Sequence, residues 1–398
     1  MNIIKIKEHL SPESYKLITS AAKTAEEMGY SLFLVGGPVR DILLNKAENL
    51  KDIDLALEGD TKSFIKVFQD KISYKKLITH EKFNTASFEI NNNLHMDIAM
   101  CRTEIYPQPA MLPVIEKSDI SDDLGRRDFS INAMAIRLTG KNKGELLDPF
   151  EGQKDLSNRI ISVLHENSFI DDPTRLYRDI RYQTRLGFNF DFATFRLFLR
   201  GKINLSLLTP ERIRYELECM LKEPDFKNVL SMANKFELFD MLGFDDTGIE
   251  YLNKLKSCDF ETGLCALCAN MDKDNITRLH EKLNLPKSTS KLAEEVNAIM
   301  HLKTSRTPSR IYETLSGYSA KAIGISSQLA SGELKRMLNT YSGKISKIKP
   351  FISSNDLKNA GIRQSAKFGK MLADLYMLQL DGKISDKADA LGKIRDLK

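Results

Sequence analysis

The sequence has few of the features that mark secreted or membrane-bound proteins. Only five of its 398 residues are cysteines, a small and odd number that fits a reducing compartment better than a disulfide framework. No stretch approaches the roughly 20 consecutive apolar residues that a membrane-spanning helix needs. The segment Met1 to His9 has no apolar core of a secretion signal. We therefore expect a cytoplasmic protein with no membrane partner.

The sequence also lacks a complete cysteine-based zinc motif. Cys265 and Cys268 form the only Cys-x-x-Cys pair, and no second pair stands near it. The pair lies in the apolar run from Gly263 to Met271, which is typical of a buried helix. We interpret these two cysteines as structural.

Positive charge is concentrated at the end of the chain. Residues 301–398 carry 18 Lys and Arg against 8 Asp and Glu, a net charge of +10, whereas the whole chain carries only +5. A basic segment on an otherwise acidic chain indicates an extended polyanion as partner, most simply a nucleic acid. A lysine-rich, solvated helical surface is the alternative that charge alone leaves open.

The stretch from Ser31 to Arg40 combines a strand, a glycine turn and the start of a helix. Gly36 and Gly37 form the turn. Two glycines let the backbone come close to a ligand, and the helix that follows points its positive N-terminus at the same place. The pattern predicts a cradle for phosphate groups, although Gly-Gly also occurs in ordinary turns.

Two carboxylates follow on the next predicted strand. Asp52 and Asp54 are two residues apart, so their side chains project from one face. Neighbouring carboxylates repel each other, and Mg²⁺ removes that cost when it is held by one or two carboxylates and substrate phosphates. Asp97, in a further β-like segment, is a candidate third acid that activates the attacking hydroxyl. Solvated strand ends are the structural alternative.

A predicted loop separates these strands from a second charged motif. Residues 103–125 contain three prolines, which forbid long regular structure. Next come Arg126 and Arg127, which can neutralise triphosphate charge. Asp128 can accept a hydrogen bond from a ribose hydroxyl and so favour ribonucleotides. An Arg–Asp pair that braces a turn is the alternative reading.

From residue 150 onward the hydrophobic pattern becomes helical. A helix that starts after Asp172 and stops at Gly187 carries arginines three or four positions apart. They are Arg175, Arg178, Arg181 and Arg185. Few acids stand nearby to pair with this cationic stripe, so we expect it to bind an anionic ligand.

Asp172 and Arg175 can also distinguish nucleobases. The carboxylate accepts hydrogen bonds and the guanidinium donates them. Cytosine and adenine present an amino donor beside a ring-nitrogen acceptor, whereas uracil and guanine present a carbonyl oxygen that Asp172 would repel. The pair therefore predicts selection of CTP and ATP without a template strand.

These motifs, in this order, resemble the class II CCA-adding tRNA nucleotidyltransferase and bacterial poly(A) polymerase family. The resemblance covers about residues 30–220 and rests on Gly36-Gly37, Arg40-Asp41, Asp52, Asp54, Arg126–Ala133, Asp172, Arg175, Arg178, Arg181 and Glu211–Ile213. It implies an α+β chain, in which a nucleotidyltransferase-fold mixed β-sheet head is followed by all-helical domains. The expected domains are the head (1–145), the neck (146–222), the body (223–300) and a basic, tRNA-binding tail (301–398).

The resemblance also implies the site residues. Asp52 and Asp54 would bind Mg²⁺. The incoming nucleotide would be contacted by Gly37, Arg40, Arg127, Asp172, Arg175, Arg178 and Arg181, to which the residue patterns add Gly36 and Asp128. At one position the chain departs from the family, because Asp171 stands where a longer Glu usually braces the base-reading arginine.

The expected activity is template-independent addition of C, C and A, or of the terminal A, from CTP and ATP to the tRNA 3′ end. CC-adding members of the family lack a flexible loop, and here the segment Thr103–Lys117 is present. A CC-adding enzyme, a poly(A) polymerase and a non-catalytic RNA-binding protein on the same scaffold are the alternatives. No protein partner is expected.

Overall fold

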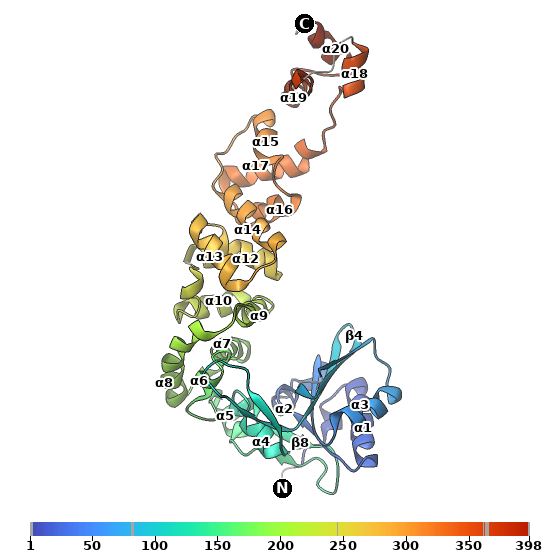
Figure 1. Cartoon of the computed structure of the whole chain (residues 1–398), viewed down its shortest axis with the longest axis vertical. Helices are drawn as coiled ribbons and strands as arrows, with labels where there is room; N and C mark the ends of the chain where they lie inside the picture. The colour runs from blue at the N-terminus through green and yellow to red at the C-terminus, as the bar shows by residue number, and fades with distance from the viewer. Residues whose placement is uncertain (1–2, 81–82, 245, 361, 363–365, 397–398) are drawn as a thin grey trace. The chain divides into compact units, whose positions relative to one another are not determined.

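The structure is a computed structural model that describes residues 3–80, 83–244, 246–360, 362 and 366–396. The chain forms two compact units, Met1–Arg212 and Ile213–Lys398. Within the described residues, every strand belongs to the first unit, and the second unit is helical (Figure 1). An α+β head followed by helices is therefore confirmed, whereas the finer division into head, neck, body and tail stays a prediction.

A mixed sheet forms the centre of unit 1. Its strands are β1 Ser31–Val35, β2 Asp52–Glu58, β3 Lys76–His80, β4 Thr85–Asn91, β5 Leu94–Met100, β8 Ala135–Arg137 and β9 Leu146–Leu147. They lie in the order β3-β4-β5-β2-β1-β8-β9. All neighbouring pairs are antiparallel except β2 and β5, which are parallel. The parallel pair brings the two acidic strands side by side.

Two smaller strand pairs lie outside this sheet. A hairpin joins β6 Arg102–Ile105 to β7 Val114–Lys117, and β10 Ile160–Ile161 pairs with β11 Asn189–Phe190. The prediction that residues 103–125 form a loop is therefore wrong for residues 103–105 and 114–117, and also for Ile120–Gly125, which form helix α4. The prolines lie in the connection between β6 and β7, where no backbone N–H is needed for hydrogen bonds between the two strands. The two strands were missed because each has only four residues, too few for a clear alternating pattern.

The remaining elements of unit 1 are helices. They are α1 Pro12–Glu27, α2 Gly37–Leu43, α3 Thr61–Phe68, α4 Ile120–Gly125, α5 Gly152–Asn158, α6 Ser168–Asp171, α7 Thr174–Leu186 and α8 Phe192–Gly201, while α9 Pro210–Leu221 continues into unit 2. Short 3₁₀ turns in this unit are η1 Ile6–Glu8, η2 Ala47–Asn49, η3 Gln69–Lys71, η5 Ser130–Asn132 and η6 Lys202–Leu207.

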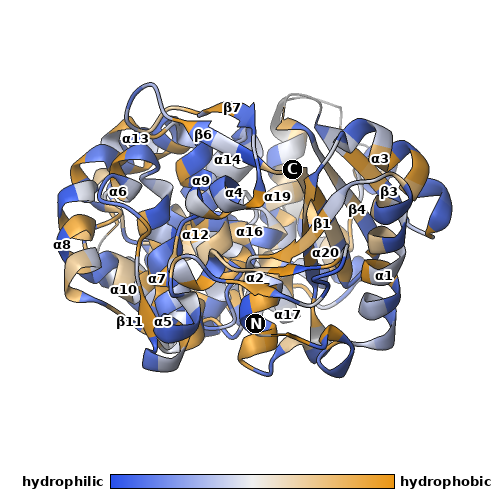
Figure 2. Ribbon diagram, turned by 90° about the horizontal axis from the view of Figure 1, so that it is seen from below, coloured by the Kyte–Doolittle hydropathy of each residue, from blue (hydrophilic) through white to orange (hydrophobic). Residues whose placement is uncertain are grey.

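The first helix shows why these sequences fold as they do. Ser11 caps α1, because its hydroxyl accepts a hydrogen bond from the Ser14 backbone N–H at 3.2 Å, and Pro12 takes the first helical position. One face of α1 is apolar and buried, with Ala21 and Ala25 fully covered. It packs against β1, along which hydrophobic colour is continuous in Figure 2.

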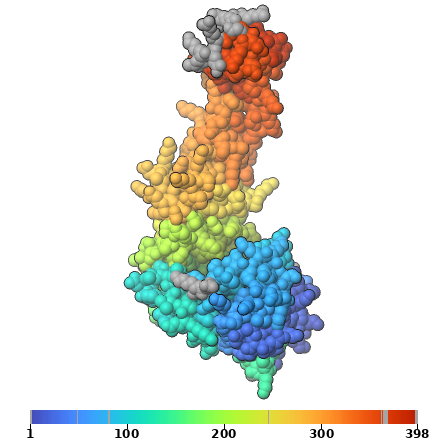
Figure 3. Space-filling model, turned by 45° about the vertical axis from the view of Figure 1, so that its right-hand side comes forward, coloured from blue at the N-terminus to red at the C-terminus, as the bar shows by residue number. Residues whose placement is uncertain are grey.

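Helix α4 is held against the sheet by apolar packing. Its residues Ile120 and Leu124 belong to a buried cluster with residues of three central strands, Phe33, Val35, Ala56 and Ala135, and with Cys101. Each fully buried side chain of this size contributes about 1.5–3 kcal/mol. This packing fixes the position of the charged residues that follow on α4 and directly after it. In the space-filling view, the blue and the cyan-to-green segments of unit 1 abut one another (Figure 3).

Unit 2 consists of helices within its described residues. They are α10 Phe226–Lys235, α11 Asp246–Asn253, α12 Phe260–Cys268, α13 Lys273–Leu283, α14 Lys287–Met300, α15 Pro308–Leu315, α16 Ala320–Leu329, α17 Gly332–Gly343, α18 Ser354–Asn359, α19 Ala366–Leu380 and α20 Lys387–Asp396, with 3₁₀ turns η7 Asp240–Leu242 and η8 Ile345–Lys347. Cys265 and Cys268 are fully buried on α12, as predicted. Throughout the part of the chain that the structure describes, no helix has the length and apolarity that crossing a membrane requires.

Candidate active site

The glycine turn lies where β1 ends and α2 begins. Gly36 has a positive φ of 71°, which favours glycine. A Cβ at this position would lie 2.9 Å from Arg127 Nη1 and 3.7 Å from Asp54 Oδ2. At Gly37 a Cβ would meet only the flexible Arg40 side chain, at 3.5 Å. Gly36 is therefore the residue that brings the backbone close to both charged groups.

The predicted acidic residues lie on the two parallel strands. Asp52 and Asp54 are on β2, and Asp97 on β5 pairs directly with Asp54. Burial raises the pKa of Asp54 to about 6, and the negative charges of Asp97 and Asp52 act in the same direction. The positive charge of Arg127 opposes this shift. The strand pairing thus concentrates like charge at one place.

This donor set fits a hard divalent cation, because it offers carboxylate oxygens that repel one another without a counter-ion. Among the described residues, no group of three or more His, Cys, Asp or Glu side chains is arranged to hold a metal by itself. A pair such as Asp52 and Asp54 would leave most of the coordination shell to substrate oxygens and water. Mg²⁺ sites that handle phosphate substrates are commonly built in this way.

Arg127 lies beside the glycine turn and is incompletely paired. Its Nη2 donates to Asp123 Oδ2 at 2.9 Å. Its Nε is buried and has no hydrogen-bond partner within the described structure. A buried guanidinium N–H without an acceptor is costly. Nη1, on the other edge of the guanidinium, faces Gly36, where it can donate to an anionic group of a substrate.

Asp128 is held by an ion pair in the present structure. Its Oδ2 accepts hydrogen bonds from Arg178 Nε at 2.9 Å and Nη2 at 2.6 Å, and its Oδ1 accepts from Asn132 Nδ2 at 3.0 Å. Burial works against the charged form, but Arg178 and Asn132 prevail and lower the pKa of Asp128. Asn132 also accepts from Arg40 Nη1 at 2.8 Å. These contacts join predicted nucleotide-binding residues from three segments, and the ribose contact of Asp128 stays a prediction.

Three arginine side chains lie close to the ring of Tyr182 on α7. The guanidinium carbons of Arg40, Arg178 and Arg185 lie 5.5–5.6 Å from the centre of its ring. The negative face of an aromatic ring attracts cations at this distance. The tyrosine therefore helps to hold positive charge together, on the same helix as the half-buried Arg181.

The proposed base-reading pair is rigidly supported. Asp172 Oδ1 accepts hydrogen bonds from the Thr174 backbone N–H at 3.0 Å, the Thr174 hydroxyl at 2.6 Å and Arg212 Nη2 at 2.5 Å. Arg175 is only 4% exposed; its Nη1 donates to the Ser168 hydroxyl at 2.6 Å and its Nη2 to a backbone carbonyl at 2.7 Å. That carbonyl belongs to residue 126, next to Arg127.

Within the described residues, no hydrogen bond joins Asp171 to Arg175. This agrees with the expectation that the shorter Asp side chain weakens the bracing. Its Oδ2 lies 3.9 Å from His165 Nδ1 instead. Ser168 and the Arg126 carbonyl support Arg175 instead. The departure from the family pattern therefore changes the bracing and leaves Arg175 fixed.

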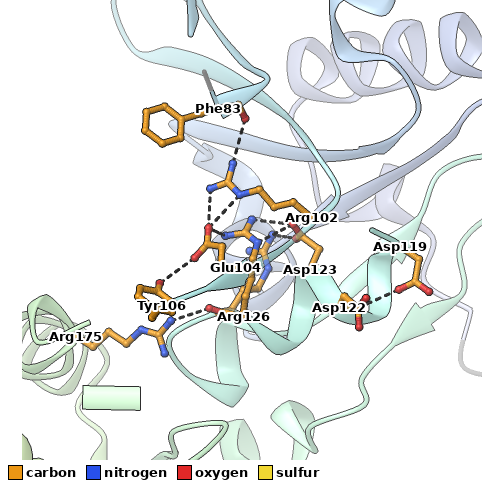
Figure 4. Close-up of polar contacts among 10 residues, drawn as sticks. Phe83, Arg102, Glu104, Tyr106, Asp119, Asp122, Asp123, Arg126 and Arg175 are labelled. Carbon is orange, nitrogen blue, oxygen red and sulfur yellow. Dashed lines mark hydrogen bonds and ion pairs between the residues drawn. The ribbon is translucent and has the colours of Figure 1, made fainter. Parts of the chain in front are cut away.

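The β6–β7 hairpin contacts the same region (Figure 4). Glu104 accepts hydrogen bonds from Arg102 and from Arg126 Nη1, the latter at 2.9 Å, and from the Tyr106 hydroxyl at 2.9 Å. A cavity of about 350 Å³ is lined by Tyr106 of the hairpin and by Arg126 and Arg175, among others. The hairpin therefore contacts Arg126, whose backbone carbonyl supports Arg175.

Several residues of the site were not assigned a role from sequence. They are Asp123, Asn132, Ser168, Tyr182 and Arg212. Asn132 and Arg212 stand inside motifs that the sequence does show. The contacts of Asp123, Ser168 and Tyr182 depend on how α4, α6 and α7 pack, and the sequence carries no local signal for that packing.

Comparison with known proteins agrees with this geometry. Residues 32–162 match the family model of the poly(A) polymerase head domain. The matched segment contains the glycine turn, the acidic strands and the Arg127 motif. The fold and the site thus define the catalytic head of a nucleotidyltransferase, in a class that is typically metal-dependent.

Curated relatives extend the match beyond the head. An A-adding tRNA nucleotidyltransferase of Halalkalibacterium halodurans is 32% identical, over 99% of this chain and 95% of its own length. An A-adding tRNA nucleotidyltransferase of Geobacter sulfurreducens is 29% identical over 96% of this chain, which spans only 47% of that longer protein.

Solved structures match over nearly the whole chain. A CCA-adding enzyme in an apo form superposes with a TM-score of 0.82 at 30% identity, covering 99% of this chain and 98% of the other. The Thermotoga maritima CCA-adding enzyme complexed with tRNA gives a TM-score of 0.74 at 28% identity, with the same coverage. The chain belongs to the class II family of CCA-adding and A-adding tRNA nucleotidyltransferases.

Substitution of Gly36 by alanine tests the close approach at the turn. Gly36→Ala adds backbone strain of about 1–2 kcal/mol and pushes Arg127 away, so we expect nucleotide incorporation to fall at least about tenfold. Gly140→Ala is the matched control, because Gly140 has a φ of 77° with no atom near its Cβ position. Steady-state incorporation assays should show the loss for Gly36→Ala alone. Equal activity of the two variants would contradict the assignment of the turn.

Removal of the Asp54 charge should stabilise the metal-free protein. The folded pKa of about 6 exceeds the unfolded value of 3.8, so the ionised group destabilises the fold as pH rises through this range. Asp54→Asn should raise the free energy of unfolding at pH 7.5 by up to about 3 kcal/mol. The gain should shrink toward pH 5, where the wild-type carboxyl becomes protonated.

Urea unfolding in EDTA at both pH values measures this difference. Asp70→Asn, at an exposed position, serves as the control and should change stability little at either pH. An Asp54→Asn variant that is less stable than the wild type at pH 7.5 would refute the like-charge interpretation.

Proposed function

We propose that this chain adds the terminal A to the 3′ end of tRNA, using ATP and no template. The single observation that carries the proposal is that Arg126 and Arg127 are adjacent in the chain. The carbonyl of Arg126 holds the base-reading Arg175, and Arg127 lies beside Gly36 and Asp54. The residue whose carbonyl supports the proposed base-reading arginine and the residue that lies beside the proposed phosphate site are therefore joined by one peptide bond.

Each site residue has a role in this reaction. The RNA 3′-hydroxyl attacks the α-phosphate in line, and pyrophosphate leaves. Asp97 pairs with Asp54 in the strand register, and in this proposal it accepts the hydroxyl proton. Arg40 and Arg127 offset negative charge on the triphosphate, together with Arg178 and Arg181 on α7.

Asp52 and Asp54 are the residues that would hold Mg²⁺. When bound, the metal would neutralise charge on the phosphate oxygens and favour departure of pyrophosphate. The like-charge interaction that raises the pKa of Asp54 is the feature that supports a cation at this place.

The base-reading pair keeps hydrogen-bonding capacity for a nucleobase. All hydrogen bonds that Asp172 accepts within the described structure end on Oδ1, so Oδ2 can accept from the adenine amino group. The two bonds of Arg175 use two of the five N–H groups that a guanidinium carries. One of the others can donate to the ring nitrogen. Cytosine offers the same pair of groups, so the pair alone admits both CTP and ATP.

The second candidate is complete addition of C, C and A. It is favoured by the superposition on CCA-adding enzymes, whose solved structures include complexes with ATP and with CTP. Terminal A addition is favoured because three relatives that align over 83–99% of this chain are A-adding enzymes. In either case the partners are tRNA and nucleoside triphosphates, and the enzyme would act in the cytoplasm. The segment at residues 301–398, with a net charge of +10, would attract the RNA.

Extension assays on three tRNA transcripts test the proposed activity. The transcripts end in the discriminator base, in C or in CC, and each is incubated with labelled ATP or CTP. Terminal A addition predicts AMP incorporation on the CC transcript and no CMP incorporation on any. Complete CCA addition predicts extension of all three, and CC addition predicts CMP without AMP.

Two further outcomes would contradict the proposal. Long adenosine tracts on any RNA would indicate a poly(A) polymerase. Retained tRNA binding without incorporation of any nucleotide would indicate a non-catalytic RNA-binding protein. The variant Asp54→Ala should still bind tRNA and incorporate nothing, and persistent turnover by it would refute the metal assignment.

Removal of the base-reading arginine should loosen base choice. Arg175→Ala deletes the donor for the ring nitrogen, so we expect discrimination against GTP and UTP to fall about 10- to 100-fold. Triphosphate affinity should change much less, because Arg40 and Arg127 remain. Arg185→Ala, on the same helix but outside the predicted pair, is the comparison variant. Unchanged ratios of kcat/KM for the four nucleotides in Arg175→Ala would refute the base-reading role.

A further inference from the structure

Asp123 on α4 shares one buried carboxylate between two arginines. Its side chain is only 1% exposed. Oδ1 accepts from Arg126 Nε at 3.0 Å and Nη2 at 2.7 Å, and Oδ2 accepts from Arg127 Nη2 at 2.9 Å. Burial opposes its charge, but the two arginines lower the pKa of Asp123. The carboxylate is therefore ionised and fully engaged.

Arg127 lies between two negative groups, Asp123 and Asp54. Of the positive charges that act on Asp54, that of Arg127 is the strongest. Yet Arg127 makes its ion pair with Asp123, and no ion pair joins it to Asp54 in the described part of the chain. Asp123 thus holds the arginine back from the carboxylate that would bind the metal.

The orientation of Arg127 follows from this pairing. With Nη2 fixed by Asp123, Nη1 points to the Gly36 turn and the buried Nε keeps no partner. Nη1 is then available to an anion at the turn. Without Asp123, the Arg127 side chain could rotate toward Asp54 and form an ion pair with it. Arg127 would then no longer be oriented to bind an anion at the turn.

We propose that Asp123 is a positioning residue, which holds Arg127 toward the incoming triphosphate and prevents it from pairing with Asp54. The inference rests on the proposed function, because it needs Arg127 to bind phosphate. Asp123 contacts no substrate and acts only through the arginine.

A purely structural role for Asp123 makes a different prediction. Helix α4 is already anchored by Ile120 and Leu124, and Arg126 is also held by Glu104. A buried ion pair is by itself weak support for a fold. If Asp123 only stabilised the fold, its loss would lower stability and leave the kinetics of the remaining folded protein unchanged.

The test uses Asp123→Asn in the full-length enzyme, well below its unfolding temperature. Loss of one charge-assisted contact should weaken ATP binding in the absence of tRNA about 10- to 100-fold, as measured by direct titration, and lower kcat/KM for ATP by a similar factor. Discrimination between ATP and GTP should stay within about threefold of wild type, since Arg175 is held by a backbone carbonyl. Asp123→Glu, which keeps the charge, should recover part of the affinity.

Two controls make the outcome decisive. Asp122→Asn alters the neighbouring residue, which is exposed and contacts Ser118, and should leave ATP affinity unchanged. Arg127→Ala should lose ATP affinity at least as strongly as Asp123→Asn. If Arg127→Ala binds ATP weakly and Asp123→Asn binds it like wild type, the positioning role is wrong and the proposed function stands.

The remaining outcomes also separate the two claims. If Arg127→Ala keeps wild-type affinity, the phosphate site itself is misassigned and the proposed function fails with it. If Asp123→Asn does not fold, Asp123→Glu carries the test: intermediate ATP affinity with unchanged base discrimination supports positioning, and wild-type affinity overturns it.

Discussion

The site depends on repulsion between carboxylates that the sheet forces together. Parallel pairing of β2 with β5 sets Asp54 directly against Asp97, and Asp52 lies two residues away on the same strand. Apolar residues on both strands are buried, so the fold cannot shift the register without exposing its core. Hydrophobic packing therefore maintains an arrangement that electrostatics disfavours. A cation bound between these carboxylates would relieve that repulsion. The same acidic residues therefore affect both the stability of the head and its chemistry.

Arginines complete the site, and each is held by a partner that sets its direction. Arg127 is fixed by Asp123, Arg178 by Asp128, and Arg175 by Ser168 and a backbone carbonyl. A guanidinium that is already oriented loses little entropy when it binds a phosphate or a base. The hairpin reaches the same network through Glu104. The head and α7 thus form one continuous set of polar contacts within unit 1.

Much of this arrangement was predictable from local sequence. The strand, glycine turn and helix from Ser31 onward, the acidic strands and the arginine helix were found because each carries a periodic or capping signal. Helix α7 begins at Thr174, two residues beyond Asp172, whose carboxylate still accepts from the Thr174 N–H. The β6–β7 hairpin and the contacts of Asp123 and Tyr182 were not predictable. They are tertiary contacts between segments whose own patterns are weak, and no local rule determines which arginine a buried carboxylate holds.

The most direct measurement is a crystal structure of the full chain with Mn²⁺ in place of Mg²⁺ and a non-reactive ATP analogue. We expect anomalous density between Asp52 and Asp54, with the adenine amino group on Asp172 Oδ2 and the triphosphate against Arg127. Metal bound elsewhere, or adenine that contacts neither Asp172 nor Arg175, would contradict it.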